Sequence, residues 1–191
     1  PYRRHIVDYH RKESAGTIVV DTDARYLYYV MPNKKAIRYG VTVGEEALIF
    51  SGVARVGALK EWPDWTPPAE MIERQPYLPR WMAGGPGNPL GARAMYLYSG
   101  SRDTMFRIHG SNEPDSIGTA TSSGCIRLTN EDVTDLFSRV DVGAKVVVLP
   151  KHAPVMARGG DSRTGMARPA GTLPRPVAAT SSGRQATARK L

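Results

Sequence analysis

Short runs of apolar residues, separated by glycine, proline and polar turns, recur along the first 150 residues of the chain. The runs are rich in β-branched and aromatic residues and follow one another at roughly 8–12 residues, a spacing typical of the strands of a sandwich or barrel. Residues 21–24, between the first two runs, have the composition of a hairpin turn. The predicted strands cover residues 17–20, 25–31, 36–43, 47–58, 94–98, 105–108 and 145–149.

Two segments have helical character instead. Thr129 can cap a helix whose first turn carries acidic residues, and Asp141-Val142-Gly143 can end it. One apolar face with helical spacing lies between them, formed by Val133, Leu136, Phe137 and Val140. A shorter helix is predicted over residues 69–74, directly after two prolines. The pattern therefore predicts a mainly β fold with one or two short helices.

Residues 61–92 interrupt the series of strands with prolines, glycines and aromatic residues. Residues 82–89 within them are expected to form irregular loop. An insertion this long in a compact domain is usually functional or mobile. Two interpretations stay open: a lid or wall of a binding cleft, or a packed connection without a ligand role.

The charge of the chain is unevenly distributed. There are 26 Lys and Arg against 18 Asp and Glu, a formal net charge of +8. Residues 151–191 contain eight basic residues and one acidic residue, so the preceding 150 residues are nearly neutral. The tail has no apolar periodicity and cannot bury enough surface to offset its ordering entropy. We expect an N-terminal extension (1–15), a folded domain (16–150) and a disordered basic tail (151–191).

The composition of the basic tail limits the partners that it can have. The tail could bind nucleic acid, anionic lipid or a wall polymer, or have no specific partner. It lacks aromatic residues on which bases could stack, so no specific nucleic-acid partner is expected.

No apolar run reaches 18 residues, which predicts no membrane-spanning helix. A single cysteine excludes an internal disulfide framework. The chain begins at Pro1 without a hydrophobic signal core, so we expect a processed N-terminus with no export signal visible.

The single cysteine stands in a distinctive context. Cys125 follows Ser122-Ser123-Gly124 and precedes the predicted helix. Glycine permits a tight turn and a close approach of substrate. Amides near a helix start can lower the pKa of a thiol and stabilise an oxyanion. A free cysteine is otherwise more often a buried structural residue, so the interpretation as a nucleophile needs a second group.

That second group is a base within hydrogen-bond reach of the thiol. His109 ends an apolar run and stands beside Gly110. The other three histidines lie near the N-terminus or where the tail begins. His109 is therefore the candidate base. A histidine–cysteine pair predicts an acylation rate that changes with pH between about 5 and 9.

The segments 109–110 and 122–127, His-Gly and Ser-Ser-Gly-Cys-Ile-Arg, closely resemble the motif of the YkuD-type L,D-transpeptidases, also called the ErfK/YbiS/YcfS/YnhG family. The resemblance extends from about residue 16 to residue 149. It implies an L,D-transpeptidase catalytic domain of mainly β structure, acting on the cell wall of a bacterium in the periplasm or elsewhere outside the cytoplasmic membrane. It implies no metal and no organic cofactor.

The resemblance also implies a reaction. A cysteine attacks the carbonyl of the third residue, often diaminopimelate, in a peptidoglycan stem tetrapeptide, and D-Ala leaves. The thioester then passes to an amine of another stem, of a wall-anchored lipoprotein or of a free D-amino acid, or to water. The alternative function is a non-catalytic peptidoglycan-binding module.

Mapped onto this sequence, Cys125 matches the nucleophile and His109 the general base. The carbonyl of Gly110 matches the group that orients the imidazole. The amides of Ser123, Gly124 and Cys125 would hold the oxyanion. Many members have histidine where this chain has Ser123, so a side-chain role at that position is in doubt.

Three further residues are candidates for substrate binding. Arg127 matches an arginine whose planar fork suits a substrate carboxylate. A salt bridge from Arg127 to Glu131 or Asp132 is the structural alternative. Ser122 is expected to fix the loop through backbone hydrogen bonds, and Asn112 lies in a segment typical of the family.

Overall fold

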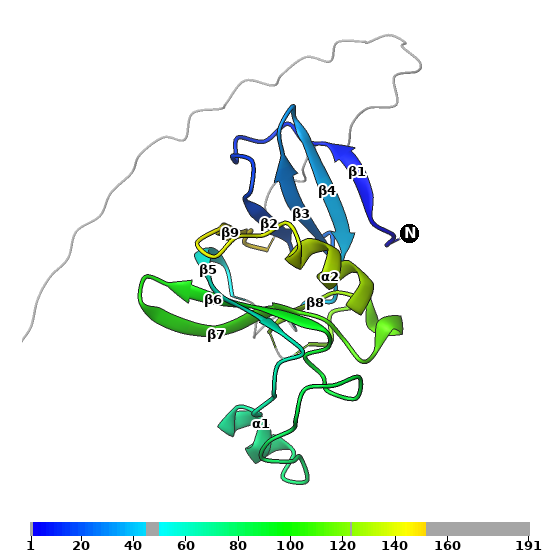
Figure 1. The fold of residues 1–191 in the computed structure, drawn as a ribbon, viewed down its shortest axis with the longest axis vertical. Helices are drawn as coiled ribbons and strands as arrows, with labels where there is room; N and C mark the ends of the chain where they lie inside the picture. The colour runs from blue at the N-terminus through cyan, green and yellow to red at the C-terminus, as the bar shows by residue number, and fades with distance from the viewer. Residues whose placement is uncertain (1, 45–49, 123, 152–191) are drawn as a thin grey trace, which may run out of the picture. The chain divides into compact units, whose positions relative to one another are not determined.

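The computed structural model describes residues 2–44, 50–122 and 124–151. The described part is mainly β with two short α-helices, which confirms the predicted fold class (Figure 1). The predicted tail from residue 152 onward and residues 47–49 of a predicted strand lie outside it. The elements are β1 (His5–Asp8), β2 (Ile18–Asp21), β3 (Tyr26–Met31), β4 (Lys35–Gly40), β5 (Gly52–Glu61), α1 (Ala69–Arg74), β6 (Arg93–Ser99), β7 (Arg102–His109), β8 (Ile126–Arg127), α2 (Asn130–Phe137) and β9 (Lys145–Val148).

The strands form one nine-stranded sheet in the order β1-β4-β3-β2-β9-β5-β6-β7-β8. Neighbours run antiparallel except for the pairs β2–β9 and β7–β8, which are parallel. The predicted hairpin turn joins β2 to β3, and within it the backbone N–H of Ala24 donates to Asp21 at 2.9 Å. A side-chain acceptor of this kind is typical of Asp in turns.

The sheet curves until its two ends meet. Thr42, just after β4, exchanges two backbone hydrogen bonds of 2.9 and 3.0 Å with Arg127 of β8. One residue further, the carbonyl of Val43 accepts from the backbone of Ser122 at 3.1 Å. β4 and β8 lie near opposite ends of the sheet order, so this contact closes the sheet around its core. It also anchors the loop that leads to Cys125.

Alternation along the strands divides the apolar side chains between two faces. In β2, Ile18 and Val20 face the main core while Val19 faces a smaller cluster on the other side. Helix α2 covers the main core with Val133 and Leu136, both fully buried, and Figure 1 shows it between β4 and β6. The smaller cluster is formed by Tyr9, Val19, Val30, Ala36 and Leu149. The segment expected as an N-terminal extension therefore supplies an edge strand and a buried tyrosine.

Helix α2 begins as the sequence predicts. The hydroxyl of Thr129 accepts from the backbone N–H of Asp132 at 3.1 Å and satisfies a first-turn amide. The helix ends at Phe137, earlier than the apolar spacing suggests. Val140 is still buried because the chain continues as a turn in which its N–H donates to the carbonyl of Leu136 at 3.2 Å.

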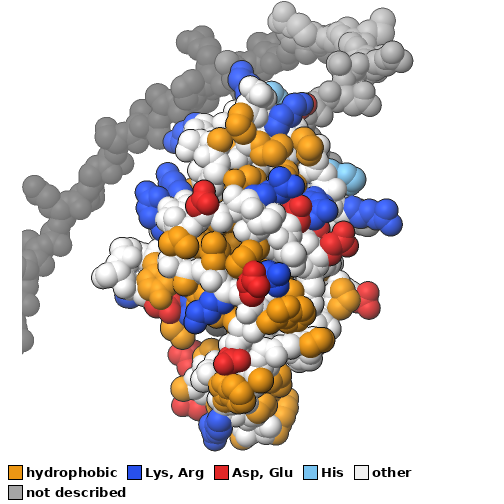
Figure 2. Space-filling view, in the orientation of Figure 1, with side chains coloured by type: hydrophobic (Ala, Val, Ile, Leu, Met, Phe, Trp, Pro, Cys, Tyr) orange, Lys and Arg blue, Asp and Glu red, His pale blue; other side chains and the backbone are white. Residues whose placement is uncertain are grey.

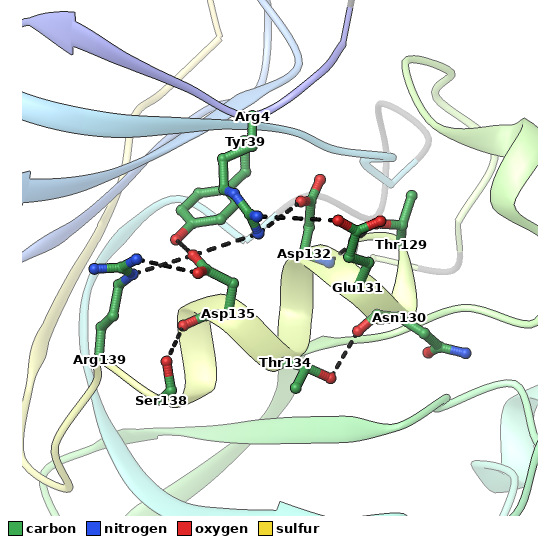
Figure 3. A network of polar contacts seen from close by, with 10 residues as sticks. All are labelled: Arg4, Tyr39, Thr129, Asn130, Glu131, Asp132, Thr134, Asp135, Ser138 and Arg139. Atoms are coloured by element: carbon green, nitrogen blue, oxygen red, sulfur yellow. Dashed lines mark hydrogen bonds and ion pairs between the residues drawn. The ribbon is translucent and has the colours of Figure 1, made fainter.

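Ion pairs fix α2 to the N-terminal segment, and a hydrogen bond fixes it to β4 (Figure 3). Arg4 lies 3.2 Å from Asp132 and 3.5 Å from Asp135. The hydroxyl of Tyr39 in β4 donates to Asp135 at 2.6 Å, and Arg139 pairs with the same carboxylate at 3.1 Å. Burial raises the pKa of Asp135, but the hydrogen bonds from Arg139 and Tyr39 and the charge of Arg4 outweigh it and leave the pKa below its usual value.

The insertion at residues 61–92 has internal order. Helix α1 occupies the predicted residues, and Trp65 and Met82 exchange two backbone hydrogen bonds of 2.8 Å. The side-chain amide of buried Asn88 donates to backbone carbonyls of the insertion, one of them that of Met82 at 3.3 Å. Figure 2 shows hydrophobic side chains gathered over this segment. Its large exposed members are Trp62, Tyr77 and Trp81.

We expect Tyr39→Phe to lower the free energy of unfolding by about 1–3 kcal/mol, because it removes a hydrogen bond to a partly buried carboxylate. Urea denaturation measures the loss. Tyr77→Phe is the matched control, since that tyrosine is 81% exposed. An equal change in both variants would contradict a structural role for the Tyr39–Asp135 contact.

Candidate active site

The parallel pairing of β7 with β8 brings the predicted catalytic residues onto one face of the sheet. Position 108 lies opposite position 126, and position 109 lies opposite position 127. Both isoleucines at the first pair are buried in the main core. Side chains alternate along a strand, so the residues on either side of these isoleucines face the other way. That other face carries Arg107, His109, Cys125 and Arg127.

The imidazole of His109 has a fixed orientation. The side chain is buried, and its Nδ1 lies 2.6 Å from the carbonyl oxygen of Gly110. A carbonyl can only accept, so Nδ1 carries the proton in this contact. Nε2 is then the ring nitrogen able to take a proton from another group. The structure thus brings together the two residues for which the sequence predicted this contact.

Close packing explains why glycine stands at position 110. A Cβ atom there would collide with the side-chain oxygen of Asn130 and approach the backbone nitrogen of Ala92 to 3.0 Å. The same Asn130 oxygen accepts from that Ala92 nitrogen at 2.9 Å. Asn130, the first residue of α2, thereby positions the segment that orients His109. This role of Asn130 was not predicted, because the contact depends on how α2 packs against residues 38 positions earlier in the chain.

The loop before Cys125 is organised by Ser122. Its hydroxyl donates to the carbonyl of Cys125 at 2.6 Å and accepts from the backbone N–H of Gly124 at 3.3 Å. Gly124 has a φ of +110°, a conformation that side chains with a Cβ rarely adopt. The Gly124 amide is therefore directed at Ser122. Ser123, the third residue expected to supply an amide, lies outside the described residues.

The helix begins where the sequence predicts it, but a strand lies between its start and the thiol. Cys125 is followed directly by strand β8, and α2 begins five residues later at Asn130. Thr129 satisfies the first-turn amide of Asp132. The chain must pair with β7 before it can turn into the helix, and this separates the thiol from the helix dipole.

Burial and charge set the ionisation of the pair in opposite directions. Burial raises the pKa of the Cys125 thiol, while a backbone hydrogen bond from Arg107 and the charges of Arg107 and Arg127 act to lower it. Burial, helped by the same two charges and opposed by the contact with Gly110, lowers the pKa of His109 to about 4. For the thiol, burial outweighs the other effects and leaves the pKa above its usual value. Near neutral pH the resting site therefore holds a neutral imidazole and a protonated thiol.

Arg127 lies away from the acids of α2. Its guanidinium is 3.6 Å from Glu113, whose side chain is 67% exposed. The alternative salt bridge to Glu131 or Asp132 is wrong, because both of these face Arg4. The contact with Glu113 leaves Arg127 able to exchange partners, since exposed ion pairs are weak.

Asn112 is exposed and connects the site to the insertion. Its side-chain amide donates to the carbonyl of Gly87 at 3.3 Å. The hydrogen bond ties the loop after His109 to residues 61–92 rather than to the cysteine loop.

The described residues contain no group of three or more His, Cys, Asp or Glu side chains arranged to hold a metal ion. Within the same ranges, no helix has the length and hydropathy needed to cross a membrane.

Comparison with known proteins places these features in a family. The model of the YkuD family, described as the L,D-transpeptidase catalytic domain, matches residues 15–148. The Escherichia coli K12 protein named "Probable L,D-transpeptidase ErfK/SrfK" is 33% identical over 139 residues. The match covers 69% of this chain and 43% of that protein, so the chain spans less than half the length of this relative.

Two solved structures are also similar. A Brucella melitensis protein described as a probable carnitine operon oxidoreductase is 49% identical, with a TM-score of 0.54 over 78% of this chain and 94% of that one. That description concerns the Brucella protein and differs from the names of the curated relatives. An L,D-transpeptidase from Mycobacterium smegmatis is 18% identical, with a TM-score of 0.54 over 70% of this chain and 58% of that one, and supports the fold alone.

The family model spans both the strand that ends in His109 and the loop that holds Cys125, and more than two thirds of the chain lies within it. The chain therefore belongs to the YkuD family of L,D-transpeptidase catalytic domains.

Proposed function

We propose that this chain is a cysteine L,D-transpeptidase that transfers an acyl group from a peptidoglycan stem tetrapeptide to an amine. One observation carries the proposal. The His109 imidazole is fixed through Nδ1 by the Gly110 carbonyl, which leaves Nε2 as the base on the sheet face that also carries Cys125. A base oriented by a third group next to a nucleophile is the arrangement used in covalent acyl transfer.

The first half-reaction forms a thioester. As Sγ of Cys125 bonds to the donor carbonyl carbon, its proton passes to Nε2 of His109. The tetrahedral intermediate then collapses, the bond to the nitrogen of D-Ala breaks, and His109 returns the proton to that nitrogen. The resting pair is neutral, so proton transfer accompanies attack instead of preceding it.

The second half-reaction releases the product. The acceptor amine gives a proton to His109 as its nitrogen bonds to the thioester carbonyl, and the bond to Sγ breaks. His109 then protonates the thiolate and restores the resting pair. The acceptor is an amine of another stem, of a lipoprotein lysine or of a D-amino acid, or it is water. The reaction is proposed to take place outside the cytoplasmic membrane.

The oxyanion needs donors directed at the developing charge. The Gly124 amide already donates to Ser122. We therefore assign the main part to the backbone N–H of Cys125, with Ser123 as a second donor. Ser122 acts by holding the loop, and Arg127 is proposed to bind a donor carboxylate.

The insertion is proposed as one wall of the substrate cleft. Its contact with Asn112 ties it to the loop that follows the base. The competing function, a peptidoglycan-binding module without turnover, uses the same cleft but forms no acyl-enzyme.

Cys125→Ala should abolish donor turnover and acylation by a carbapenem, because the variant lacks the atom that forms the thioester. Intact mass spectrometry detects a single adduct on the unmodified protein and none on the variant. Ser101→Ala, in the turn between β6 and β7, is the control and should acylate normally. A folded unmodified protein with a free thiol and no adduct would favour the binding module.

The acylation rate should fall about tenfold per pH unit below pH 4, because a protonated His109 cannot accept the thiol proton. Above that pH the histidine is neutral, so its inflection lies below the interval of about 5–9 expected from the sequence. Rapid-quench mass spectrometry from pH 3 to pH 9 gives the profile, with circular dichroism as the check on folding. A histidine inflection between pH 6 and pH 7 would contradict the buried, neutral base.

Arg127→Gln should raise KM for a donor with free carboxylates about tenfold and change kcat less, because it removes a charge-assisted hydrogen bond. For an amidated donor, the KM of the variant should be close to that of the unmodified protein. Arg3→Gln removes an exposed charge elsewhere and serves as the control. Equal losses with free and amidated donors would show that Arg127 does not bind the carboxylate.

A further inference from the structure

A left-handed residue interrupts strand β7 close to the catalytic pair. Met105 has a φ of +65°, although it is not glycine, and its side chain is 63% exposed. The pairing of β6 with β7 shifts register at the same place. A β-bulge next to an active site commonly redirects a side chain, and strained backbone persists where the surroundings hold it.

The bulge brings together two side chains that a regular strand would separate. Asp103 and Arg107 are four residues apart, which corresponds to about 13 Å along an extended strand. Here they form a bidentate ion pair, with Nη1 to Oδ1 at 2.6 Å and Nη2 to Oδ2 at 2.9 Å. Asp103 also accepts from the backbone N–H of Met105 at 2.8 Å, so the ion pair and the bulge stabilise each other.

A second contact fixes the guanidinium of Arg107 from the neighbouring strand. It lies 4.2 Å from the ring centroid of Tyr96 in β6, directly across the ladder. The side chain is 13% exposed, compared with 22% for Arg127. Arg107 is thus held by a planar ion pair and an aromatic face, whereas Arg127 has one long contact with an exposed acid.

The charge held in this way lies beside the nucleophile. Arg107 and Cys125 directly precede the isoleucines that pair in the parallel ladder, and the backbone of Arg107 hydrogen-bonds the thiol. Its positive charge acts on both members of the catalytic pair, while Asp103 lies further along the strand toward the hairpin. Among the described residues no α-helix begins beside the thiol, since α2 starts beyond β8.

We propose that Arg107 is a positioning residue, held by the Met105 bulge, Asp103 and Tyr96, whose fixed cation stabilises the anionic form of the Cys125 sulfur. The proposal deepens the proposed function, because it assigns to Arg107 the electrostatic part that a helix start plays for other thiols. The charge of Arg127 acts on Cys125 in the same direction, but Arg127 has only the contact with the exposed Glu113 to hold it in place.

The other charged groups near the thiol are accounted for within the described residues. His109 is neutral above about pH 4. Glu113 pairs with Arg127, and the ammonium of Lys60 lies over the Tyr96 ring, 4.9 Å from its centroid. Asp64, the other acid near Tyr96, accepts from the backbone N–H of Gly84 at 3.0 Å.

The test measures alkylation of Cys125 by iodoacetamide as a function of pH, which needs no peptide substrate. Arg107→Gln should move the thiol inflection upward and slow alkylation below that inflection about three- to tenfold. Arg107→Lys should recover most of the rate. Arg102→Gln, the same change on the same strand, and Lys60→Gln should leave the profile unchanged.

A second readout separates loss of charge from loosening of the site. Burial raises the pKa of Cys125 and lowers that of His109, so a looser site would lower the first and raise the second. Removal of the Arg107 charge should raise both pKa values. Histidine proton NMR, assigned with His109→Gln, follows the imidazole while alkylation follows the thiol.

A thiol inflection that falls or stays unchanged in Arg107→Gln would overturn the proposal. The effect should also persist at about 0.5 M NaCl, where the Debye length is about 4 Å, because the guanidinium is largely buried. If Arg107→Gln does not fold, Arg107→Met keeps the contact with the Tyr96 ring and lacks the charge. If the alkylation profiles behave as expected but the unmodified protein does not turn over the donor, the proposed function is refuted and the role of Arg107 is not.

Discussion

The pairing of a two-residue strand with the end of β7 is the constraint on which the site depends. β8 consists of Ile126 and Arg127, and β7 on one side and Thr42 on the other hold it in place. Its isoleucine is buried in the main core, so the residues flanking it must face the other side of the sheet. Cys125 is therefore positioned by the hydrophobic core behind it, and any slip of register would turn the thiol away from His109.

The same burial that fixes the pair makes ionisation costly, because it lowers the pKa of His109 and raises that of Cys125. Acyl transfer by a neutral pair requires the proton to move as the new bond forms, so the orientation of the imidazole matters more than its resting charge. That orientation depends on the carbonyl of Gly110. The side chain of Asn130 packs so closely against Gly110 that it leaves no room for a Cβ atom there. The contacts between α2 and Arg4 and Tyr39 hold the helix that supplies Asn130 (Figure 3).

Much of the fold was predictable because its signals are local. The composition of residues 21–24 predicted the turn of the β2–β3 hairpin, and Thr129 followed by acidic residues predicted the N-cap of α2; both signals need only neighbours in sequence. Closure of the sheet through Thr42 and Arg127 was not predictable, because it joins residues 85 positions apart through backbone groups common to every residue. The inclusion of β1 and Tyr9 in the sheet and its second cluster likewise depends on a partner strand distant in the chain.

The sequence by itself determined the chemistry of the site: one thiol, one histidine at the end of a strand, and a motif that identifies the family. These features depend only on residue types and on their spacing, both of which can be read from the sequence. Only the tertiary structure decided that a strand lies between the thiol and the helix, and that Glu131 and Asp132 face Arg4 instead of Arg127. It also decided that Arg107 lies beside the thiol, because cross-strand register and the bulge at Met105 set that proximity.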